Sequence, residues 1–318
     1  MKIVILDGSA ANPGDISWEK IERFGDLTVY DVTSSEQLIE RAKGAQICIT
    51  NKTAFTAEVI DQLPDLKYIG VLATGYNVID LEACTRRGIT VTNVPEYSTF
   101  ATAQMTAALL LELTNNAGLH SDSVMNGDWV RSPQFCYWKR PLTELWNKNA
   151  VVFGYGKIGR RVAQIFKALG MNVTAVPHHM PEVKEEGGIR FASKEEAFRD
   201  ADVISLHSPL TNETKDLINK DSLKGCKDGV IIINAARGPL VNENDIAEAL
   251  RSGKVAGYGA DVVSVEPMKA DNPLLTTPNT IITPHTAWAP GETRIRLIDM
   301  CADNIEAFLK GEPINKVN

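Results

Sequence analysis

The sequence is short of the features that mark several classes of protein. Its five cysteines are odd in number and far apart, with no CxxC pair and no histidine at zinc-ligand spacing, so we expect reduced thiols and no metal site. No segment approaches the roughly 18 apolar residues that span a membrane. The apolar run at residues 3–6 is too short for a signal peptide. These absences favour a protein of the cytoplasm.

Positive charge is also scarce. Acidic residues outnumber Lys and Arg by 40 to 33, and the formal net charge is −7. A basic face able to hold a polyanion would have to prevail over that field. Together with the missing membrane span, this balance argues against nucleic acid and against a membrane as partners.

What the sequence does contain is an alternation of strand and helix patterns, over a length that suits two domains. From residue 1 we expect strands at 3–6, 27–30, 46–50, 68–72 and 90–93, with helices at 18–24, 35–42, 57–63 and 80–87. A second series has strands at 151–153, 172–176, 203–206, 230–234, 256–258 and 280–282, and helices at 242–250 and 291–309. Such series give open parallel sheets.

A glycine motif opens the second series. Gly154, Gly156 and Gly159 follow the apolar strand at 151–153 and precede an amphipathic run. In a dinucleotide-binding unit the first glycine permits a tight turn, the second lets the backbone approach a pyrophosphate, and the third lets the helix lie close to the strand. An ordinary βα turn is the alternative. The strand at 172–176 favours dinucleotide binding because it closes a unit of the expected length.

One residue expected of such a unit is missing. An NAD-selective unit carries Asp or Glu roughly 20 residues on, at the end of its second strand, to bind the ribose 2′-hydroxyl. Pro177, His178 and His179 follow that strand instead. A 2′-phosphate would tolerate histidine better than a carboxylate, although two mostly neutral imidazoles substitute poorly for Arg. The choice between NAD and NADP stays open.

An aromatic-rich segment separates the two series. After a hinge at Pro95, Ser98 or Thr99 can cap a helix that runs to Asn116 and is apolar over much of its circumference. We expect such a helix to need a cover that one chain of this size can hardly supply by itself. Residues 120–145 then carry several aromatic side chains, which is unusual for a connector: Trp129, Phe135, Tyr137 and Trp138. We interpret this segment as an arm that packs on another subunit, with a flap against its own chain as the alternative.

Polar residues follow three strands of the second series. Arg237, Glu266 and His285 should meet near a bound dinucleotide, because the carboxyl ends of parallel strands converge on one crevice. Arg can bind a carboxylate and polarise the adjacent carbonyl, His can donate a proton to the incipient alkoxide, and Glu can hold the other imidazole nitrogen. Taken singly, an Arg in a loop is usually a surface charge and Glu266-Pro267 is usually a turn. Together they suit hydride transfer to a 2-oxo acid.

The loop at residues 72–77 is a further candidate site. It follows the strand at 68–72, and Gly75 would free backbone N–H groups to face an anion. A plain turn explains the same residues equally well.

Several motifs resemble the D-isomer-specific 2-hydroxyacid dehydrogenases over nearly the whole chain. They are Gly154-Tyr155-Gly156-Lys157-Ile158-Gly159-Arg160, His207-Ser208-Pro209-Leu210-Thr211 with Thr214, Asn234-Ala235-Ala236-Arg237-Gly238-Pro239-Leu240-Val241, Asp261-Val262 through Glu266-Pro267, and Thr283-Pro284-His285-Thr286-Ala287-Trp288. Residues 70–77 and 135–138 look more particularly like the glycerate dehydrogenase (hydroxypyruvate reductase) branch. The chain departs from the pattern at Pro177, where NAD-using relatives carry Asp, and at Ala235, where Thr is commoner.

The resemblance implies a role for individual residues. Arg237 would bind the substrate and stabilise charge, and Glu266 would hold His285, the general acid and base. The cofactor-binding set would be Gly154, Tyr155, Gly156, Lys157, Ile158, Gly159, His178, His207, Pro209, Ala235, Ala236, Arg237, Asp261 and His285. The substrate-binding set would be Ala73, Thr74, Gly75, Arg237, His285 and, from a partner subunit, Trp138.

The expected fold is α/β with two doubly wound parallel-sheet domains, the second a Rossmann dinucleotide-binding domain. Residues 1–97 and 287–318 would form the substrate domain, and 98–286 the dinucleotide-binding domain with a dimerisation arm at about 118–146. The implied activity is reduction of hydroxypyruvate or glyoxylate to the D-2-hydroxy acid with NAD(P)H, by a homodimer.

Three alternatives remain from the sequence. The substrate could be another acid such as 2-ketogluconate, the reaction could be oxidation of formate or phosphite, or the chain could be a dinucleotide-sensing corepressor on the same fold. Glu266-Pro267 argues against formate, because the histidine is positioned by Gln in those relatives. The short segment after residue 309 argues against a corepressor, which has long tails.

Overall fold

The computed structural model describes all residues, 1–318, and the chain divides into two compact units. Unit 1 comprises Met1–Ser98 and Trp288–Asn318, and unit 2 comprises Thr99–Ala287. None of the helices combines the length and the apolar character that crossing a bilayer requires.

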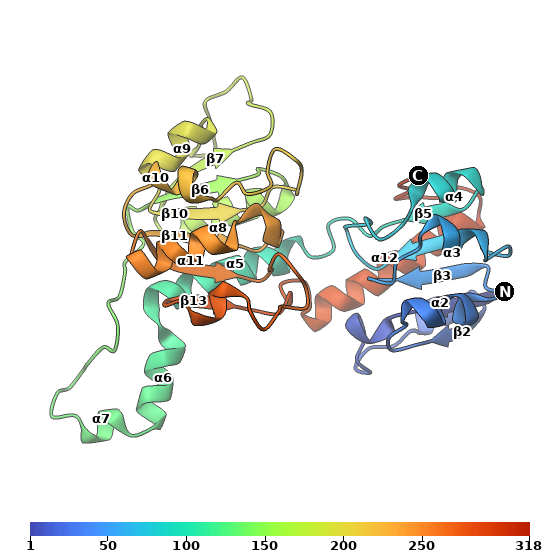
Figure 1. Cartoon of the computed structure of the whole chain (residues 1–318), viewed down its shortest axis with the longest axis horizontal. Helices are drawn as coiled ribbons and strands as arrows, with labels where there is room; N and C mark the ends of the chain where they lie inside the picture. The colour runs from blue at the N-terminus through green and yellow to red at the C-terminus, as the bar shows by residue number, and fades with distance from the viewer. The chain divides into compact units, whose positions relative to one another are not determined.

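Unit 1 is built on a five-stranded parallel sheet with the strand order β2-β1-β3-β4-β5 (Figure 1). Its strands are β1 (Lys2–Ile5), β2 (Asp26–Val29), β3 (Ile47–Thr50), β4 (Tyr68–Val71) and β5 (Thr90–Thr92). Its α-helices are α1 (Glu19–Glu22), α2 (Ser35–Ala42), α3 (Ala57–Asp61), α4 (Leu81–Arg86) and α12 (Gly291–Leu309). Every residue of β3 and β4 is buried, as expected of central strands that are covered on both faces.

Helices cover both faces of this sheet because successive residues of a strand point to opposite sides. Val4 of β1 packs in an apolar cluster with residues of α2, α3 and α4. Its neighbours Ile3 and Ile5 pack in a second cluster with residues of α1 and α12. The C-terminal helix is therefore part of the core of unit 1.

Unit 2 is built on an eight-stranded sheet with the order β13-β12-β11-β10-β6-β7-β9-β8. Its strands are β6 (Asn149–Phe153), β7 (Asn172–Val176), β8 (Glu185–Glu186), β9 (Ile189–Phe191), β10 (Val203–Leu206), β11 (Val230–Asn234), β12 (Val255–Ala260) and β13 (Thr280–Ile282). All neighbouring pairs are parallel except β8 with β9. The predicted Rossmann-type arrangement is confirmed.

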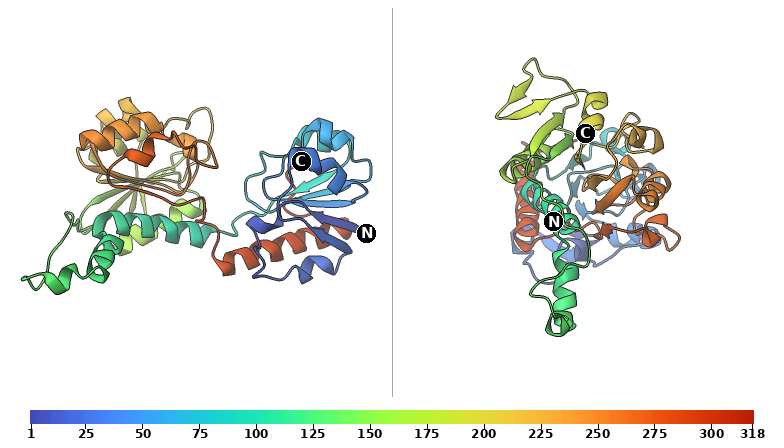
Figure 2. Two further views of the ribbon diagram at one scale, coloured as in Figure 1. Left: turned by 60° about the horizontal axis from the view of Figure 1, so that its bottom comes forward. Right: turned by 90° about the vertical axis from the view of Figure 1, so that its left-hand side faces the viewer.

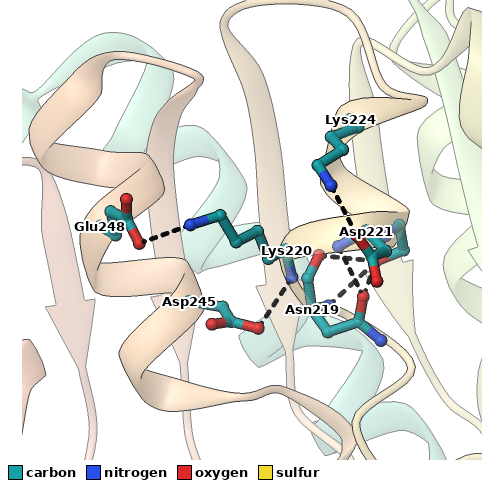
Figure 3. Close-up of polar contacts among 7 residues, drawn as sticks. Asn219, Lys220, Asp221, Lys224, Asp245 and Glu248 are labelled. Carbon is teal, nitrogen blue, oxygen red and sulfur yellow. Dashed lines mark hydrogen bonds and ion pairs between the residues drawn. The ribbon is translucent and has the colours of Figure 1, made fainter.

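The helices of unit 2 lie on both faces of its sheet. One face is covered by α5 (Thr99–Asn115) and α8 (Lys157–Ala168). The other is covered by α9 (Lys194–Asp200), α10 (Lys220–Lys224) and α11 (Glu243–Ser252). Figure 3 shows how α10 and α11 are joined: the backbone N–H of Lys220 donates to Asp245 at 2.8 Å, and its ammonium lies 3.5 Å from Glu248.

The expectation that α5 needs a cover from outside the unit is largely wrong. The helix packs against α8, β11 and β12, and Leu109 and Leu110 are buried. Among its large apolar side chains only Phe100 and Leu111 are exposed.

The segment after α5 extends away from the sheet of unit 2, as Figures 1 and 2 show. It contains α6 (Ala117–Met125), α7 (Asp128–Arg131) and a loop at residues 132–146, and we call residues 117–146 the arm. Its exposed large apolar side chains include Met125, Trp129, Val130, Phe135, Trp138, Leu142 and Trp146. The apolar surface that lacks a cover therefore lies on the arm rather than on α5.

Candidate active site

His285 and Glu266 form a direct contact in unit 2. The Nδ1 atom of His285 lies 2.7 Å from Oε2 of Glu266, and both side chains are about one third exposed. Because a carboxylate only accepts hydrogen bonds, Nδ1 must carry the proton in this contact. Nε2 is then the imidazole nitrogen that is left to exchange a proton with a ligand.

The backbone of His285 is held in an uncommon conformation. Its φ is 54°, in the left-handed region that residues other than glycine rarely adopt. The N–H of His285 donates to the carbonyl of Asp261 at 2.8 Å, which fixes this conformation. Residues held in this way cluster at functional sites, where the surrounding structure stabilises the strain.

The carboxylate of Asp261 holds the loop that carries His285. Asp261 directly follows β12 and is buried, with 1% of its surface exposed. Its Oδ1 accepts the Thr283 hydroxyl at 2.5 Å and the Thr286 N–H at 2.9 Å, and its Oδ2 accepts the Ala287 N–H at 2.8 Å. A buried carboxylate with this many donors is fully satisfied within the chain. Its side chain thus positions residues 283–287.

Arg237 is exposed in the loop after β11. One of its guanidinium nitrogens donates to the carbonyl of Ala236 at 2.7 Å. The buried amide of Asn234 shapes the loop from below: it donates to the Arg237 carbonyl at 2.9 Å and accepts the Ala236 N–H at 3.1 Å. Most donors of the guanidinium remain for a ligand carboxylate.

The loops that carry Arg237 and Glu266 touch through their backbones. A Cβ atom on Gly238 would lie 2.0 Å from the carbonyl carbon of Val263 and 2.4 Å from the nitrogen of Ser264. The N–H of Ser264 also donates to Glu243 of α11 at 2.7 Å. These contacts bring the Arg237 loop beside the loop of Glu266, which in turn contacts His285.

The glycine loop has the geometry expected of a dinucleotide site. Gly154 has a φ of 88°, and a Cβ there would lie 2.6 Å from the backbone of His207. A Cβ on Gly159 would lie 1.9 Å from the carbonyl oxygen of Gly154. Gly156 differs, because a Cβ there would meet nothing within 4 Å. It caps the 12-residue helix α8 without a side-chain hydrogen bond, so a phosphate can reach the helix N-terminus.

His207 lies against this loop as a neutral imidazole. Its Nε2 is 2.7 Å from the hydroxyl of Ser205, while its Nδ1 is buried without a partner in the chain. Burial lowers the pKa of His207 to about 3. An unpaired buried nitrogen beside an open glycine backbone fits a site that a polar ligand completes.

The end of β7 lies next to the glycine loop, since the Gly154 N–H donates to the Val176 carbonyl at 2.9 Å. Pro177 therefore stands where an acidic residue would contact a ribose. The rings of His178 and His179 follow, exposed and 4.2 Å apart. On the other side of the loop, Arg160 stacks over Tyr155 at 4.4 Å and pairs with Glu186 at 3.3 Å.

The remaining predicted cofactor residues lie around the same edge of unit 2. Lys157 and Ile158 form the first turn of α8, His207 and Pro209 follow β10, and Ala235 and Ala236 follow β11. The hydroxyl of Thr214 donates to the Pro209 carbonyl at 2.6 Å, which holds the loop after β10.

In unit 1, Ala73, Thr74 and Gly75 form the loop after β4. The Thr74 hydroxyl donates to the Val94 carbonyl at 3.0 Å, and the Asn93 amide donates to the Thr74 carbonyl at 2.8 Å. The neighbouring loop is equally ordered, because the Asp7 carboxylate accepts the N–H groups of residues 51–53 at 2.6 to 2.9 Å. Hydrogen bonds therefore hold both loops at this edge of unit 1.

Comparison with known proteins matches residues 107–287 to the NAD binding domain of the D-isomer specific 2-hydroxyacid dehydrogenases. The chain is also 47% identical to a hydroxypyruvate reductase of Blautia hydrogenotrophica over the full length of both. It belongs to the D-isomer specific 2-hydroxyacid dehydrogenase family. The resemblance that the motifs indicated is thus confirmed, and the chain is an oxidoreductase that acts on CH–OH groups with a nicotinamide dinucleotide.

Two further proteins illustrate the family. A glycerate dehydrogenase of Methylorubrum extorquens is 40% identical over 89% of this chain and 88% of its own length. The structure of D-lactate dehydrogenase from Aquifex aeolicus, complexed with NAD and lactic acid, is 29% identical with a TM-score of 0.83, covering 98% of this chain and 96% of that one. The first similarity agrees with the glycerate dehydrogenase branch suggested by residues 70–77 and 135–138.

Several residues of the site were missed by the sequence analysis. Asn234, Gly238 and Glu243 shape the loops through contacts within the chain, and Asp261 was expected only as one of the cofactor-binding residues. The available signal was weak: Asn234 and Asp261 are polar residues at or directly after a strand end, Gly238 lies in the loop after β11, and Glu243 is the first residue of α11. Their partners are more than 20 residues away for Asp261, Gly238 and Glu243, so local patterns could not reveal the contacts.

Proposed function

We propose that this protein reduces a short 2-oxo acid, hydroxypyruvate or glyoxylate, to the D-2-hydroxy acid with NADH or NADPH. The observation that carries the proposal is the 2.7 Å contact between His285 and Glu266, which leaves Nε2 of the imidazole for the substrate oxygen. The similarity to a hydroxypyruvate reductase over the whole chain supports the substrate class.

Arg237, Glu266 and His285 have different roles at the substrate carbonyl. A bound reduced nicotinamide would supply the hydride to C2 of the oxo acid. His285 donates its Nε2 proton to the oxygen that becomes the hydroxyl, while Glu266 stabilises the imidazolium before that transfer. Arg237 binds the substrate carboxylate and polarises the carbonyl through its fork of N–H donors.

We further propose that Ala73, Thr74 and Gly75 bind the substrate carboxylate through backbone N–H groups. Their loop lies at the carboxyl end of a parallel strand, where open α/β sheets bind ligands. Unit 1 would then be the substrate domain, approximately residues 1–97 and 287–318, and unit 2 the dinucleotide-binding domain, approximately 98–286.

For the cofactor, the proposal is that both NADH and NADPH are accepted. The cofactor-binding residues would be those of the glycine loop, His207, Pro209, Ala235, Ala236 and the backbone near Asp261. With Pro177 at the end of β7, no carboxylate repels a 2′-phosphate, and exposed His178 can donate to it. Two mostly neutral imidazoles substitute poorly for Arg, which argues against a strict NADPH requirement. The family resemblance and the five free cysteines also favour a location in the cytoplasm.

The arm supports the proposal of a homodimer. Its exposed Trp129, Phe135 and Trp138 form apolar surface that a monomer would leave in water. In this proposal Trp138, 68% exposed, reaches the active site of the second copy and limits the size of the substrate side chain. In light scattering at micromolar concentration a dimer should give twice the 34.8 kDa of the chain. A mass near that of one chain would refute the dimer.

One alternative substrate and one alternative function remain testable. If the substrate pocket were wide, the preferred substrate would be a longer acid such as 2-ketogluconate. A dinucleotide-sensing binding protein would bind the cofactor without turnover, so an activity assay separates it from an enzyme.

The direct experiment is a panel of 2-oxo acids assayed with NADH and with NADPH by absorbance at ~340 nm, on protein shown to be folded by circular dichroism. The panel contains glyoxylate, hydroxypyruvate, pyruvate and 2-ketogluconate, and the product is analysed on a chiral column. We expect the fastest turnover with hydroxypyruvate or glyoxylate, and D-glycerate from the former. No cofactor oxidation with any acid would refute the enzymatic proposal.

A further inference from the structure

The backbone on both sides of Trp138 is anchored although the tryptophan itself is exposed. On one side, the hydroxyl of Tyr137 lies 2.9 Å from that of Ser123 in α6. On the other side, the ammonium of Lys139 lies 2.7 Å from Asp128 of α7, which also accepts the Ser123 hydroxyl at 2.6 Å. The guanidinium of Arg140 donates to Asn279 at 2.9 Å. The residues on both sides of Trp138 are thus tied to other elements through their side chains.

His120 supplies the anchor on the main chain itself. Its Nδ1 lies 2.7 Å from the Asn116 carbonyl, an acceptor, so Nδ1 carries the proton. Its Nε2 accepts the backbone N–H of Lys139 at 3.0 Å. The imidazole therefore bridges the start of α6 to the residue after Trp138, and it uses both nitrogens to do so.

This bridge requires the neutral imidazole. A protonated ring has N–H donors on both nitrogens, so Nε2 would then face the Lys139 N–H donor to donor. His120 also lines an apolar hollow of about 310 Å³ in the arm, with Val124, Trp129, Cys136, Tyr137 and Leu142. If the bridge were lost, the loop residues that line this hollow could move away from α6.

We propose that neutral His120 is a positioning residue, which fixes Trp138 for the discrimination of 2-oxo acids by the size of their side chain. This inference rests on the proposed role of Trp138. It assigns part of the discrimination to a histidine that is separate from Arg237, Glu266 and His285. It also implies that the discrimination weakens when His120 is protonated.

Other ionisable groups around the bridge must be separated from His120 in any pH experiment. They are Glu112 of α5, Asp122 of α6, Asp128 and Arg131 of α7, and Cys136, Tyr137 and Lys139 of the loop. Hydrogen bonds from Lys139 and Ser123 lower the pKa of Asp128 to about 2, and Asp128 raises the pKa of Lys139. That ion pair therefore persists in mild acid.

The first experiment measures the bridge without any catalysis. Amide hydrogen exchange of peptides that cover residues 136–140 is compared in the wild type, His120→Leu and His120→Gln, with Ser121→Leu as control because Ser121 is an exposed neighbour in α6. Leucine removes the acceptor, whereas the glutamine oxygen can replace Nε2. We expect exchange at least tenfold faster in His120→Leu alone. Equal exchange in all four proteins would overturn the proposal.

The second experiment measures discrimination as the ratio of kcat/KM for glyoxylate to that for 2-ketogluconate. Because His285 donates the proton to both acids, a change in its protonation affects both values and cancels in the ratio. His120→Leu and Trp138→Ala should lower the ratio three- to tenfold through KM, while His120→Gln and Ser121→Leu keep it. In the wild type the ratio should fall where His120 is protonated, and this fall should be absent from His120→Leu.

The outcomes separate this inference from the function on which it rests. If Trp138→Ala changes the ratio but His120→Leu does not, the positioning role of His120 is wrong. If neither variant changes the ratio, the pocket role of Trp138 fails, and the inference fails with it. If no oxo acid is reduced, the proposed function fails, while hydrogen exchange still tests the bridge.

Discussion

Gly238 and Val263 touch so closely that no side chain fits between them: a Cβ on Gly238 would lie 2.0 Å from the carbonyl carbon of Val263. The contact joins the loop of Arg237 to the loop of Glu266. Since the atoms that would clash with this Cβ, the carbonyl group of Val263 and the nitrogen of Ser264, all belong to the backbone, neither loop can yield without moving a proposed catalytic residue.

Gly238→Ala should therefore damage activity more than folding. We expect kcat/KM to fall at least about tenfold and stability to fall by roughly 1–3 kcal/mol, the usual cost of overpacking. The matched control is Gly225→Ala, where the nearest atom to a Cβ is the Ser222 carbonyl oxygen at 3.5 Å. Equal activity in the two variants, measured beside thermal melts, would show that the Gly238 contact does not position the site.

Asp261→Asn should loosen the loop that carries His285. The amide turns an NH₂ group toward a backbone or hydroxyl donor that the carboxylate now accepts, at a cost of roughly 1–3 kcal/mol for the unsatisfied groups. We expect a lower kcat with a cofactor dissociation constant that changes less. Asp271→Asn, at an exposed position, is the control. A wild-type kcat in Asp261→Asn would contradict the positioning role.

The buried imidazole of His207 should make the protein sensitive to acid. Its pKa of about 3 lies below the ~6.5 of an unfolded histidine. Between these two values the unfolded chain binds the extra proton, so the free energy of unfolding falls as the pH falls, by roughly 2 kcal/mol from pH ~7 to ~5. His207→Gln should lose less over that interval in urea titrations. Equal losses in both proteins would count against a neutral buried His207.

Pro177→Asp should shift the cofactor preference toward NADH. The new carboxylate would accept the ribose 2′-hydroxyl and repel a 2′-phosphate. We expect the ratio of kcat/KM with NADH to that with NADPH to rise about tenfold, which corresponds to about 1.4 kcal/mol. Pro177→Asn, which lacks the charge, should change the ratio much less. The same shift in both variants would mean that loss of the proline, not the charge, sets the preference.

Much of the fold could be predicted because its strands are continuous apolar runs. The expected ranges 172–176, 203–206, 230–234 and 280–282 match β7, β10, β11 and β13, and 291–309 matches α12. The helices α6, α7, α9 and α10 were not predicted, because they lack a long apolar stripe. α9 did offer a local signal, the capping box of Ser193 and Glu196. The pair β8–β9 offered none, since β8 is two exposed glutamates.

The site was predictable only in part, for a related reason. Arg237, Glu266 and His285 could be proposed from the sequence because strand ends converge in a parallel sheet. The groups that aim them could not, because the contact of Asp261 with Ala287 and that of Gly238 with Val263 join segments about 25 residues apart. Nor could the bridge from His120 to Lys139, which depends on a helix in the arm that no pattern indicated.

The central claim is that His285, aligned by Glu266, donates the proton in the reduction of a 2-oxo acid. Its most direct test is kcat for hydroxypyruvate or glyoxylate in His285→Ala, measured beside the dissociation constant of the reduced cofactor. We predict that kcat falls by roughly 10²- to 10⁴-fold, the range typical of a lost general acid, while cofactor binding changes less than about twofold, within a few tenths of a kcal/mol. A kcat close to that of the wild type would contradict the account.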